Sequence, residues 1–218
     1  MQSSPERACN ICGESAVRFL SFGDAAKAIR CPNCLSFERH RRFKDAYDRF
    51  IRHEFDFRGK DVLACVPGKA ELEYFFVGAK RVVSFDVRPV NWFDLQMDIT
   101  DMSQIPDASV DVFVAIAVLQ HVERHELVPP EVHRVLRPGG RCLIQATNHR
   151  GPTTPYPNLH AHYTEEEFEK YRVGTFRVYR DLDLISMFTN GFVSKTFYGE
   201  DPVCGGIDFI LSAEKVGV

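Results

Sequence analysis

The sequence has no long hydrophobic run; its longest uninterrupted apolar stretch is about eight residues, 112–119. A helix needs about 20 apolar residues to cross a bilayer, so we expect no membrane-spanning segment and no membrane partner. The first seven residues lack the apolar core of a signal peptide. Without an export signal, the seven cysteines are expected to be reduced thiols rather than a disulfide framework. These absences together predict a cytoplasmic protein.

A strong excess of positive charge is also missing. The formal net charge is −3, which argues against an extended nucleic-acid-binding surface. The charge is unevenly spread, because residues 1–44 carry eight Lys and Arg against four acidic residues, giving +4 there and −7 in the remainder. A length of 218 residues, 44% of them hydrophobic, fits one ordinary domain plus a small module.

Two Cys-x-x-Cys pairs stand out near the N-terminus: Cys9 with Cys12, and Cys31 with Cys34. Eighteen residues separate them, a distance typical of zinc ribbons in which four thiolates hold one ion. Four thiolates leave no open position for a substrate, so the predicted zinc site is structural. Two redox pairs or unrelated free cysteines are the alternative interpretation.

A helix is predicted directly after the second cysteine pair. Apolar residues recur at helical spacing over residues 36–51, and Ser36 is the expected N-cap. A basic cluster occupies its first turns and consists of Arg39, His40, Arg41, Arg42 and Lys44. This cluster could hold a phosphate or an anionic substrate, or it could be the solvated face of a linker helix.

The rest of the chain alternates strand-like and helix-like segments. Strands are expected at 61–65, 81–86, 95–100, 110–116 and 142–146, and two more at 192–197 and 207–213. The run 112–119 is apolar at consecutive positions, which indicates a strand that is covered on both faces. A helix is expected at 182–189.

Three motifs in this part resemble class I S-adenosylmethionine-dependent methyltransferases of the small type 11-like family. The matching segments are Val-Asp-Val-Phe at 110–113, Val-Leu-Gln-His-Val at 118–122 and Arg-Val-Leu-Arg-Pro-Gly-Gly at 134–140. The segment 31–43 also resembles a subgroup that places a cysteine-pair ribbon and a basic helix before the catalytic domain.

The resemblance implies an α/β fold, a three-layer Rossmann-like methyltransferase sandwich with a seven-stranded, mostly parallel sheet. In the family the last strand inserts antiparallel between the fifth and sixth. The expected organisation is a zinc ribbon at 1–36, an amphipathic linker helix at 37–58 and a methyltransferase domain at 59–218 with a substrate lid at 148–180.

The resemblance also implies S-adenosylmethionine as cofactor. Asp86 ends the second strand about 20 residues after the first turn, where a carboxylate can accept both ribose hydroxyls. Asp98 is expected on the adenine amino group and Ile99 against the ring. The complete expected cofactor set is Cys65, Pro67, Gly68, Asp86, Val87, Asp98, Ile99, Ala115, Ile116 and His121.

The sequence departs from the family at the turn after the first strand. The family has a glycine-rich turn with an acidic residue that holds the cofactor's amino group, whereas this chain has Val66-Pro67-Gly68 and no acid before Glu71. Gln120 likewise stands where the family has glutamate.

Residues 148–180 are rich in turn formers, and Thr164 with Glu167 forms a capping box that opens a short helix. Long ordered insertions of this kind tend to carry function, here as a lid over the acceptor. The candidate catalytic residues are His121, His160, His162 and Tyr163, because imidazole titrates near neutral pH and can serve as a base. A structural role for His121, and metal binding by the two lid histidines, are the alternatives.

The predicted function is methyl transfer to a small-molecule or sugar-like acceptor, by O- or N-methylation. One alternative is an RNA methyltransferase that uses the ribbon and the basic helix, which makes nucleic acid the second candidate partner. The other is a non-catalytic binding protein that keeps the fold.

Overall fold

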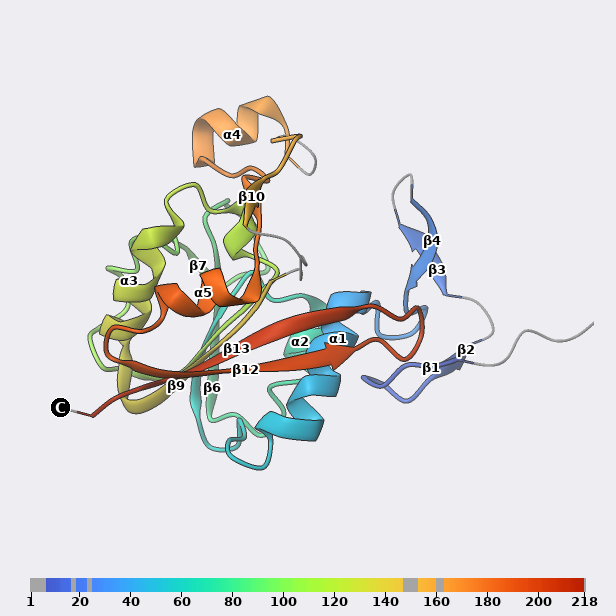
Figure 1. The fold of residues 1–218 in the computed structure, drawn as a ribbon, viewed down its shortest axis with the longest axis horizontal. Helices are drawn as coiled ribbons and strands as arrows, with labels where there is room; N and C mark the ends of the chain where they lie inside the picture. Colours follow the sequence, from blue (N-terminus) through green and yellow to red (C-terminus); the bar gives the residue numbers. More distant parts are fainter. Residues whose placement is uncertain (1–6, 17–18, 23–24, 147–152, 160–162, 218) are drawn as a thin grey trace, which may run out of the picture.

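The computed structural model describes residues 7–16, 19–22, 25–146, 153–159 and 163–217 (Figure 1). Its centre is a seven-stranded sheet with the order β12-β13-β9-β8-β5-β6-β7. The strands are β5 (Asp61–Cys65), β6 (Arg81–Asp86), β7 (Leu95–Gln96), β8 (Val110–Ile116), β9 (Leu136–Ala146), β12 (Phe192–Glu200) and β13 (Ile207–Lys215). Neighbours among β5 to β9 are parallel, and β13 runs antiparallel to both β9 and β12. The predicted sheet and its antiparallel last insertion are confirmed.

Helices cover both faces of this sheet, as Figure 1 shows. They are α1 (Glu38–Ala46), α2 (Lys69–Tyr74), α3 (Val128–Val135) and α5 (Asp181–Met187). Alternate residues of β8 belong to different cores: Val112 and Val114 share one with α1 and α2, whereas Phe113 and Ala115 share the other with α3 and α5. Each face of β8 is therefore buried, which is why its sequence is apolar at consecutive positions. The three-layer arrangement is the one predicted.

The N-terminal segment forms two small antiparallel hairpins. They are β1 (Arg7–Ala8) with β2 (Ser15–Ala16), and β3 (Leu20–Phe22) with β4 (Ala25–Arg30). The helix that follows begins at Glu38 with Phe37 as its N-cap, and it continues into a π-helical turn at Tyr47–Ile51. The prediction of Ser36 as N-cap was wrong, because the Ser36 hydroxyl lies 3.2 Å from the Cys34 sulfur instead.

The segment between β9 and α5 carries a short hairpin and a helix. These are β10 (Thr154–Pro155), β11 (Arg177–Val178) and α4 (Glu165–Tyr171). The Thr164 hydroxyl accepts the Glu167 N–H (3.1 Å) and the Glu167 carboxylate accepts the Thr164 N–H (2.9 Å), so the predicted capping box is confirmed. In Figure 1 α4 stands beyond the end of the sheet.

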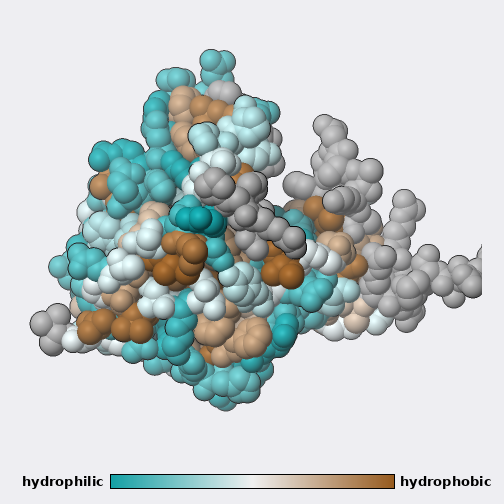
Figure 2. Space-filling model, viewed as in Figure 1, coloured by the Kyte–Doolittle hydropathy of each residue, from teal (hydrophilic) through white to brown (hydrophobic). Residues whose placement is uncertain are grey.

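The surface shown in Figure 2 is largely hydrophilic, with separate hydrophobic patches rather than one continuous apolar face. Scattered apolar residues of this kind are normal on a folded domain. Among the residues described, no helix is both long enough and apolar enough to traverse a lipid bilayer.

Candidate functional site

A cavity of about 1290 Å³ opens at the carboxyl ends of β5, β6 and β8. The chain passes from β5 to β6 on one side and returns to the other side of β5 through β8, which makes a topological switch point. Ligands of open α/β sheets bind at such a point. Seven of the predicted cofactor residues line the cavity: Cys65, Asp86, Val87, Asp98, Ile99, Ile116 and His121.

The turn after β5 places Val66 in a backbone conformation that usually requires glycine. Val66 has a φ of +51°, in the left-handed region that side chains with a branched Cβ rarely adopt. Its N–H donates to the Phe85 carbonyl (2.8 Å), and its side chain borders the cavity. Pro67 and Gly68 are not among the described residues that line the cavity. Strain of this kind tends to collect at functional sites.

Glu71 does not take the place of the missing acid. Its carboxylate accepts the Gly68 N–H (2.5 Å) and lies 3.3 Å from His40 Nε2, and it is not among the described cavity-lining residues. His40 Nδ1 accepts the Phe37 N–H (3.2 Å), so the proton of the neutral ring is on Nε2 and points at Glu71. Burial raises the pKa of Glu71 to about 7 and lowers the pKa of His40 well below its usual range. The pair joins α1 to the turn from inside the protein.

Asp86 is buried at the end of β6, where the ribose-binding acid was predicted. Arg88 contacts both of its oxygens: Nη2 lies 2.8 Å from Oδ2 and Nε 3.2 Å from Oδ1. The Arg88 guanidinium also lies 3.5 Å from Glu167 of α4 and 5.6 Å from the ring of Tyr163. A ribose diol would therefore compete with Arg88 for the carboxylate, and the displaced guanidinium still has partners near α4.

Asp98 follows the short strand β7, and one of its oxygens accepts both the N–H and the hydroxyl of Thr100 (2.8 Å each). This bonding fixes the carboxylate at the cavity wall beside the largely buried Ile99. At the end of β8, Ala115 is fully buried, whereas Ile116 and Ala117 line the cavity. Ala117 has a φ of +56°, a second left-handed position at the carboxyl edge.

Of the four predicted catalytic residues, two are placed in the cavity wall. His121 Nδ1 lies 3.1 Å from the Gly174 carbonyl, so Nδ1 carries the proton and Nε2 is the basic nitrogen of the neutral ring. The Tyr163 ring meets the His121 ring edge to face at 5.2 Å. Burial raises the pKa of Tyr163 to about 12, so its hydroxyl stays protonated at neutral pH and can donate a hydrogen bond. His160 and His162 lie outside the described residues.

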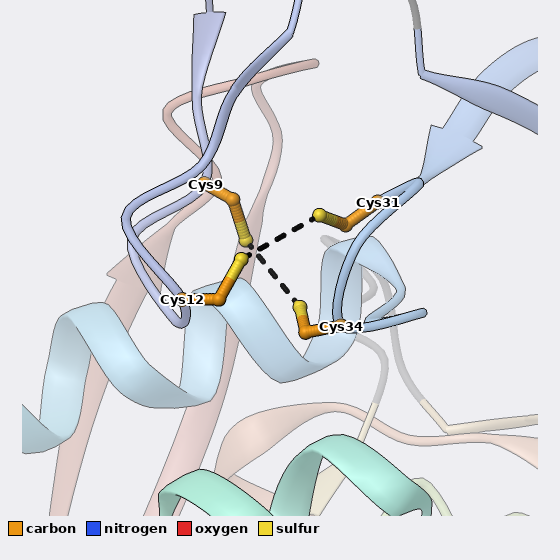
Figure 3. A group of neighbouring side chains, drawn as sticks. All are labelled: Cys9, Cys12, Cys31 and Cys34. Carbon is orange, nitrogen blue, oxygen red and sulfur yellow. Dashed lines mark hydrogen bonds between the residues drawn. The ribbon is translucent and has the colours of Figure 1, made fainter.

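The four cysteines of the two pairs converge, with all sulfurs within 4.8 Å of one another (Figure 3). The Sγ atoms of Cys9 and Cys34 are 3.8 Å apart, as are those of Cys12 and Cys31. Tetrahedral zinc with Zn–S bonds of about 2.3 Å requires sulfurs about 3.8 Å apart. The Ser36 hydroxyl lies 3.5 Å from Cys9 Sγ and 3.2 Å from Cys34 Sγ, where it can donate to a bound thiolate. The donor set and its spacing therefore fit zinc.

The basic cluster of α1 is not a solvated phosphate-binding face. Arg41 is fully buried and forms a two-bond ion pair with Asp201 (2.8 Å each). Arg42 bonds to Asp208 (3.1 Å), and Lys44 pairs with Asp48 one turn later in the chain. Arg41 and Arg42 therefore join α1 to the loop after β12 and to β13, whereas the Lys44 pair lies within one helical segment.

Several cavity-lining residues were absent from the sequence-based site. Among them are Glu38, Arg39, Arg42, Arg88, Gln120, Tyr171, Arg172, Val173 and Asp208. The basic cluster was an available signal for Arg39 and Arg42, and Arg88 could have been suspected from its position two residues after Asp86. Asp208 gave no local signal, because it reaches the cavity only through the pairing of β13 with β9.

Comparisons with known proteins agree with this architecture. Residues 66–144 match the family model described as a methyltransferase domain. No curated protein matches the chain. One similar solved structure is the 1,6-didemethyltoxoflavin-N1-methyltransferase of Burkholderia thailandensis with bound 1,6-didemethyltoxoflavin and S-adenosylhomocysteine; it is 17% identical, with a TM-score of 0.59, over 81% of this chain and 79% of that one.

Two further structures show how widely the fold is used. A SAM-dependent methyltransferase from Methanosarcina mazei is 14% identical, with a TM-score of 0.55, over 77% of this chain and 97% of that one. The [4+2]-cyclase SpnF is also 14% identical, with a TM-score of 0.60, over 92% of this chain and 86% of that one. Identities this low establish the fold alone. The chain thus has the Rossmann-like fold of S-adenosylmethionine-dependent methyltransferases, and its central segment matches their domain model.

Proposed function

We propose that this protein transfers a methyl group from S-adenosylmethionine to a small-molecule or sugar-like acceptor at oxygen or nitrogen. The observation that carries the proposal is the placement of Asp86 and Asp98 at the ends of β6 and β7, in one cavity at the switch point of the sheet. An acid at the end of the second strand can accept both hydroxyls of a ribose. The methyltransferase-domain match over residues 66–144 includes both acids.

When bound, S-adenosylmethionine supplies an electrophilic methyl group on a sulfonium sulfur. The work left to the protein is to hold an acceptor in line and close to that methyl. The basic Nε2 of His121 is suited to taking a proton from an acceptor hydroxyl or amine, because its Nδ1–H is held by Gly174. The Tyr163 hydroxyl is suited to donating a hydrogen bond to the acceptor, and His160 and His162 remain further candidates.

The ion pairs of the basic residues near α1 favour a small acceptor over RNA. Arg41, Arg42 and Lys44, which would contact phosphates in an RNA-binding protein, are bonded to carboxylates of the same chain. The non-catalytic alternative keeps its support in the turn at Val66–Gly68, and SpnF is by its printed description a cyclase with this fold. Measurements of cofactor binding and of turnover distinguish a methyltransferase from a non-catalytic protein.

The test is calorimetry with S-adenosylhomocysteine on the parent protein and on Asp86→Ala. Loss of a charged acceptor for two hydroxyls should weaken binding about ten- to a hundredfold. Asp107→Ala is the matched control, because that carboxylate is 77% exposed and is not among the described cavity residues. Equal affinity of a folded Asp86→Ala protein would move the ribose contact elsewhere. No binding by the parent would favour a non-catalytic role.

We further propose that the four cysteines bind one structural zinc ion. Elemental analysis of protein purified without added metal should give one zinc per chain, and the double change Cys9→Ser, Cys12→Ser should abolish it. Cys204→Ser is the control, since that cysteine lies outside the cluster. Because metal binding at such sites is coupled to folding, chelation should destabilise the ribbon before the main domain. Full metal content in the double variant would contradict the assignment.

A further inference from the structure

The first two residues of α1, Glu38 and Arg39, carry opposite charges and both line the cavity. Neither belongs to an ion pair among the described residues. Glu38 Oε2 is shielded from solvent and receives no hydrogen bond from any described donor. The Arg39 guanidinium stacks over the Phe37 ring at 4.4 Å and has no carboxylate or carbonyl partner in the described part of the chain.

Unpaired charges in a partly enclosed cavity are costly unless something binds them. Burial lowers the pKa of Arg39, and the Glu38 carboxylate opposes that shift only through space. The next two residues of the same helix turn have partners within the protein: the neutral His40 ring faces Glu71, and Arg41 is bonded to Asp201. Glu38 and Arg39 are the two members of this turn that are left for a ligand.

The backbone that presents these two residues is held in place. The Arg39 carbonyl accepts a hydrogen bond from Gln145 (3.0 Å) at the end of β9, and the Phe37 N–H is bonded to His40. A Cβ added to Gly68 would lie 3.3 Å from the His40 ring, so the head of α1 is packed directly against the turn after β5. The methyltransferases that the sequence resembles hold the amino-acid end of the cofactor at this turn with an acidic residue. In this chain the turn has no acidic residue before Glu71.

We propose that Glu38 and Arg39 form the subsite for the α-amino acid group of the cofactor, with Arg39 binding the carboxylate and Glu38 the ammonium group. A planar guanidinium matches a carboxylate with two parallel hydrogen bonds, and a carboxylate is the natural acceptor for an ammonium group. The inference rests on the proposed use of S-adenosylmethionine. It moves recognition of the methionine end from the loop after β5 to the helix that follows the ribbon.

The test compares two ligands that differ only at this end. S-Adenosylhomocysteine has the adenosine, the thioether and the amino acid group, whereas 5′-methylthioadenosine has the first two alone. In calorimetry, Arg39→Gln and Glu38→Gln should each weaken S-adenosylhomocysteine about ten- to a hundredfold and leave 5′-methylthioadenosine unchanged. Arg39→Lys should recover part of the loss, because it keeps the charge without the fork.

Two control variants distinguish a failure of the proposed amino-acid subsite from a failure of the proposed function. Asp86→Ala should weaken both ligands by the same factor, because both have the ribose. Arg49→Gln removes an exposed arginine that is paired with Asp45 and should weaken neither. Unchanged S-adenosylhomocysteine affinity in folded Arg39→Gln and Glu38→Gln proteins, or equal losses for the two ligands, would overturn the subsite alone. Failure of the parent to bind either ligand would overturn the proposed function as well.

Discussion

Arg41 offers the sharpest test of how the N-terminal cysteine-containing segment is attached to the main sheet domain. It is fully buried, and its guanidinium bonds to Asp201 through two contacts of 2.8 Å. The same group donates to the carbonyls of Ile29 (2.9 Å) and Ser36 (3.1 Å) in the ribbon segment. One side chain thus connects the ribbon, α1 and the loop between β12 and β13.

The perturbation is Arg41→Met, which keeps the apolar stem and removes the charge. Breaking a buried ion pair by deleting one partner costs about 3–5 kcal/mol, because the remaining charge stays buried without compensation. Asp201 keeps bonds from the Val203 N–H (2.9 Å) and the Cys204 thiol (2.6 Å), which places the expected loss within that range rather than above it. Against a total stability of about 5–15 kcal/mol, this is a large fraction.

The assay is urea unfolding of the parent, Arg41→Met and the exposed control Arg49→Met, followed by circular dichroism. The control should lose less than about 1 kcal/mol, since its pair with Asp45 is at the surface. Adding Asp201→Asn to Arg41→Met should recover part of the deficit, because no charge is then left buried. A deficit no larger than that of the control, or no recovery in the double variant, would refute the reasoning.

The pH dependence of the same deficit gives an independent check. Although burial acts to raise the pKa of Asp201, the bonds from Arg41 and Cys204 outweigh it and hold that pKa below its usual range. A depressed carboxyl pKa means that the stabilisation is complete above the unfolded-state value of about 3.9 and is lost as pH falls through the folded-state value. The difference between parent and Arg41→Met should therefore shrink under acidic conditions.

Two further predictions concern the edge of the cavity. Burial raises the pKa of Glu71 to about 7, above its unfolded value of about 4.3, so ionisation of this carboxyl should lower the free energy of unfolding as pH rises between those values. In urea titrations, Glu71→Gln should therefore raise the free energy of unfolding by up to about 3 kcal/mol at pH 8 and leave it unchanged near pH 4. The exposed control Glu73→Gln should leave the free energy of unfolding unchanged at both pH values. Parallel profiles for the parent and Glu71→Gln would contradict this. Ala117→Gly should raise the free energy of unfolding by about 1 kcal/mol, because glycine relieves the strain of a φ of +56°. The control Ala115→Gly, in the regular strand, should lower the free energy of unfolding by a similar amount. A lower free energy of unfolding in both variants would show that Ala117 is unstrained.

The strands were predictable because their signals are local, whereas their number and order in the sheet were implied by the resemblance to class I methyltransferases. Consecutive apolar residues mark strands that are buried on both faces, and β8 follows this pattern from Val112 to Ile116. The capping box at Thr164 is likewise written within four residues. Ser36 shows where local reasoning fails: its position suited an N-cap, but its hydroxyl is taken by the cysteine sulfurs.

Part of the candidate site was predictable from strand ends, whereas His121 was named from the family motif and Tyr163 from the insertion after the fifth strand. Asp86 and Asp98 reach the cavity because parallel strands end at a common edge, which the strand pattern already implies. Arg88 lies at the same edge, but its bonds to Asp86 and its contact with Glu167 depend on how α4 is placed. No spacing in the sequence specifies that placement, since 78 residues separate Arg88 from Glu167.

The N-terminal turn of α1 shows most clearly why its basic composition does not indicate one basic surface. Successive residues of a helix point about 100° apart, so four adjacent charged side chains must meet different surroundings. Glu38 and Arg39 reach the cavity, His40 meets Glu71 under the turn, and Arg41 meets Asp201 and the ribbon. A run that could be taken for one basic surface is therefore divided among the cavity, a hydrogen bond between neutral His40 and Glu71, and one internal ion pair at Arg41. The partner of Arg41 lies 160 residues away, beyond any local pattern.

This division also shows what the N-terminal cysteine-containing segment contributes to the fold. Arg39 and Arg41 are two positions apart on α1 and therefore point to nearly opposite sides of the helix. The ribbon carbonyls of Ile29 and Ser36 hold Arg41, and Gln145 holds the main chain of Arg39. These contacts hold α1 on both sides, so the segment before it helps to fix the direction in which Arg39 faces the cavity.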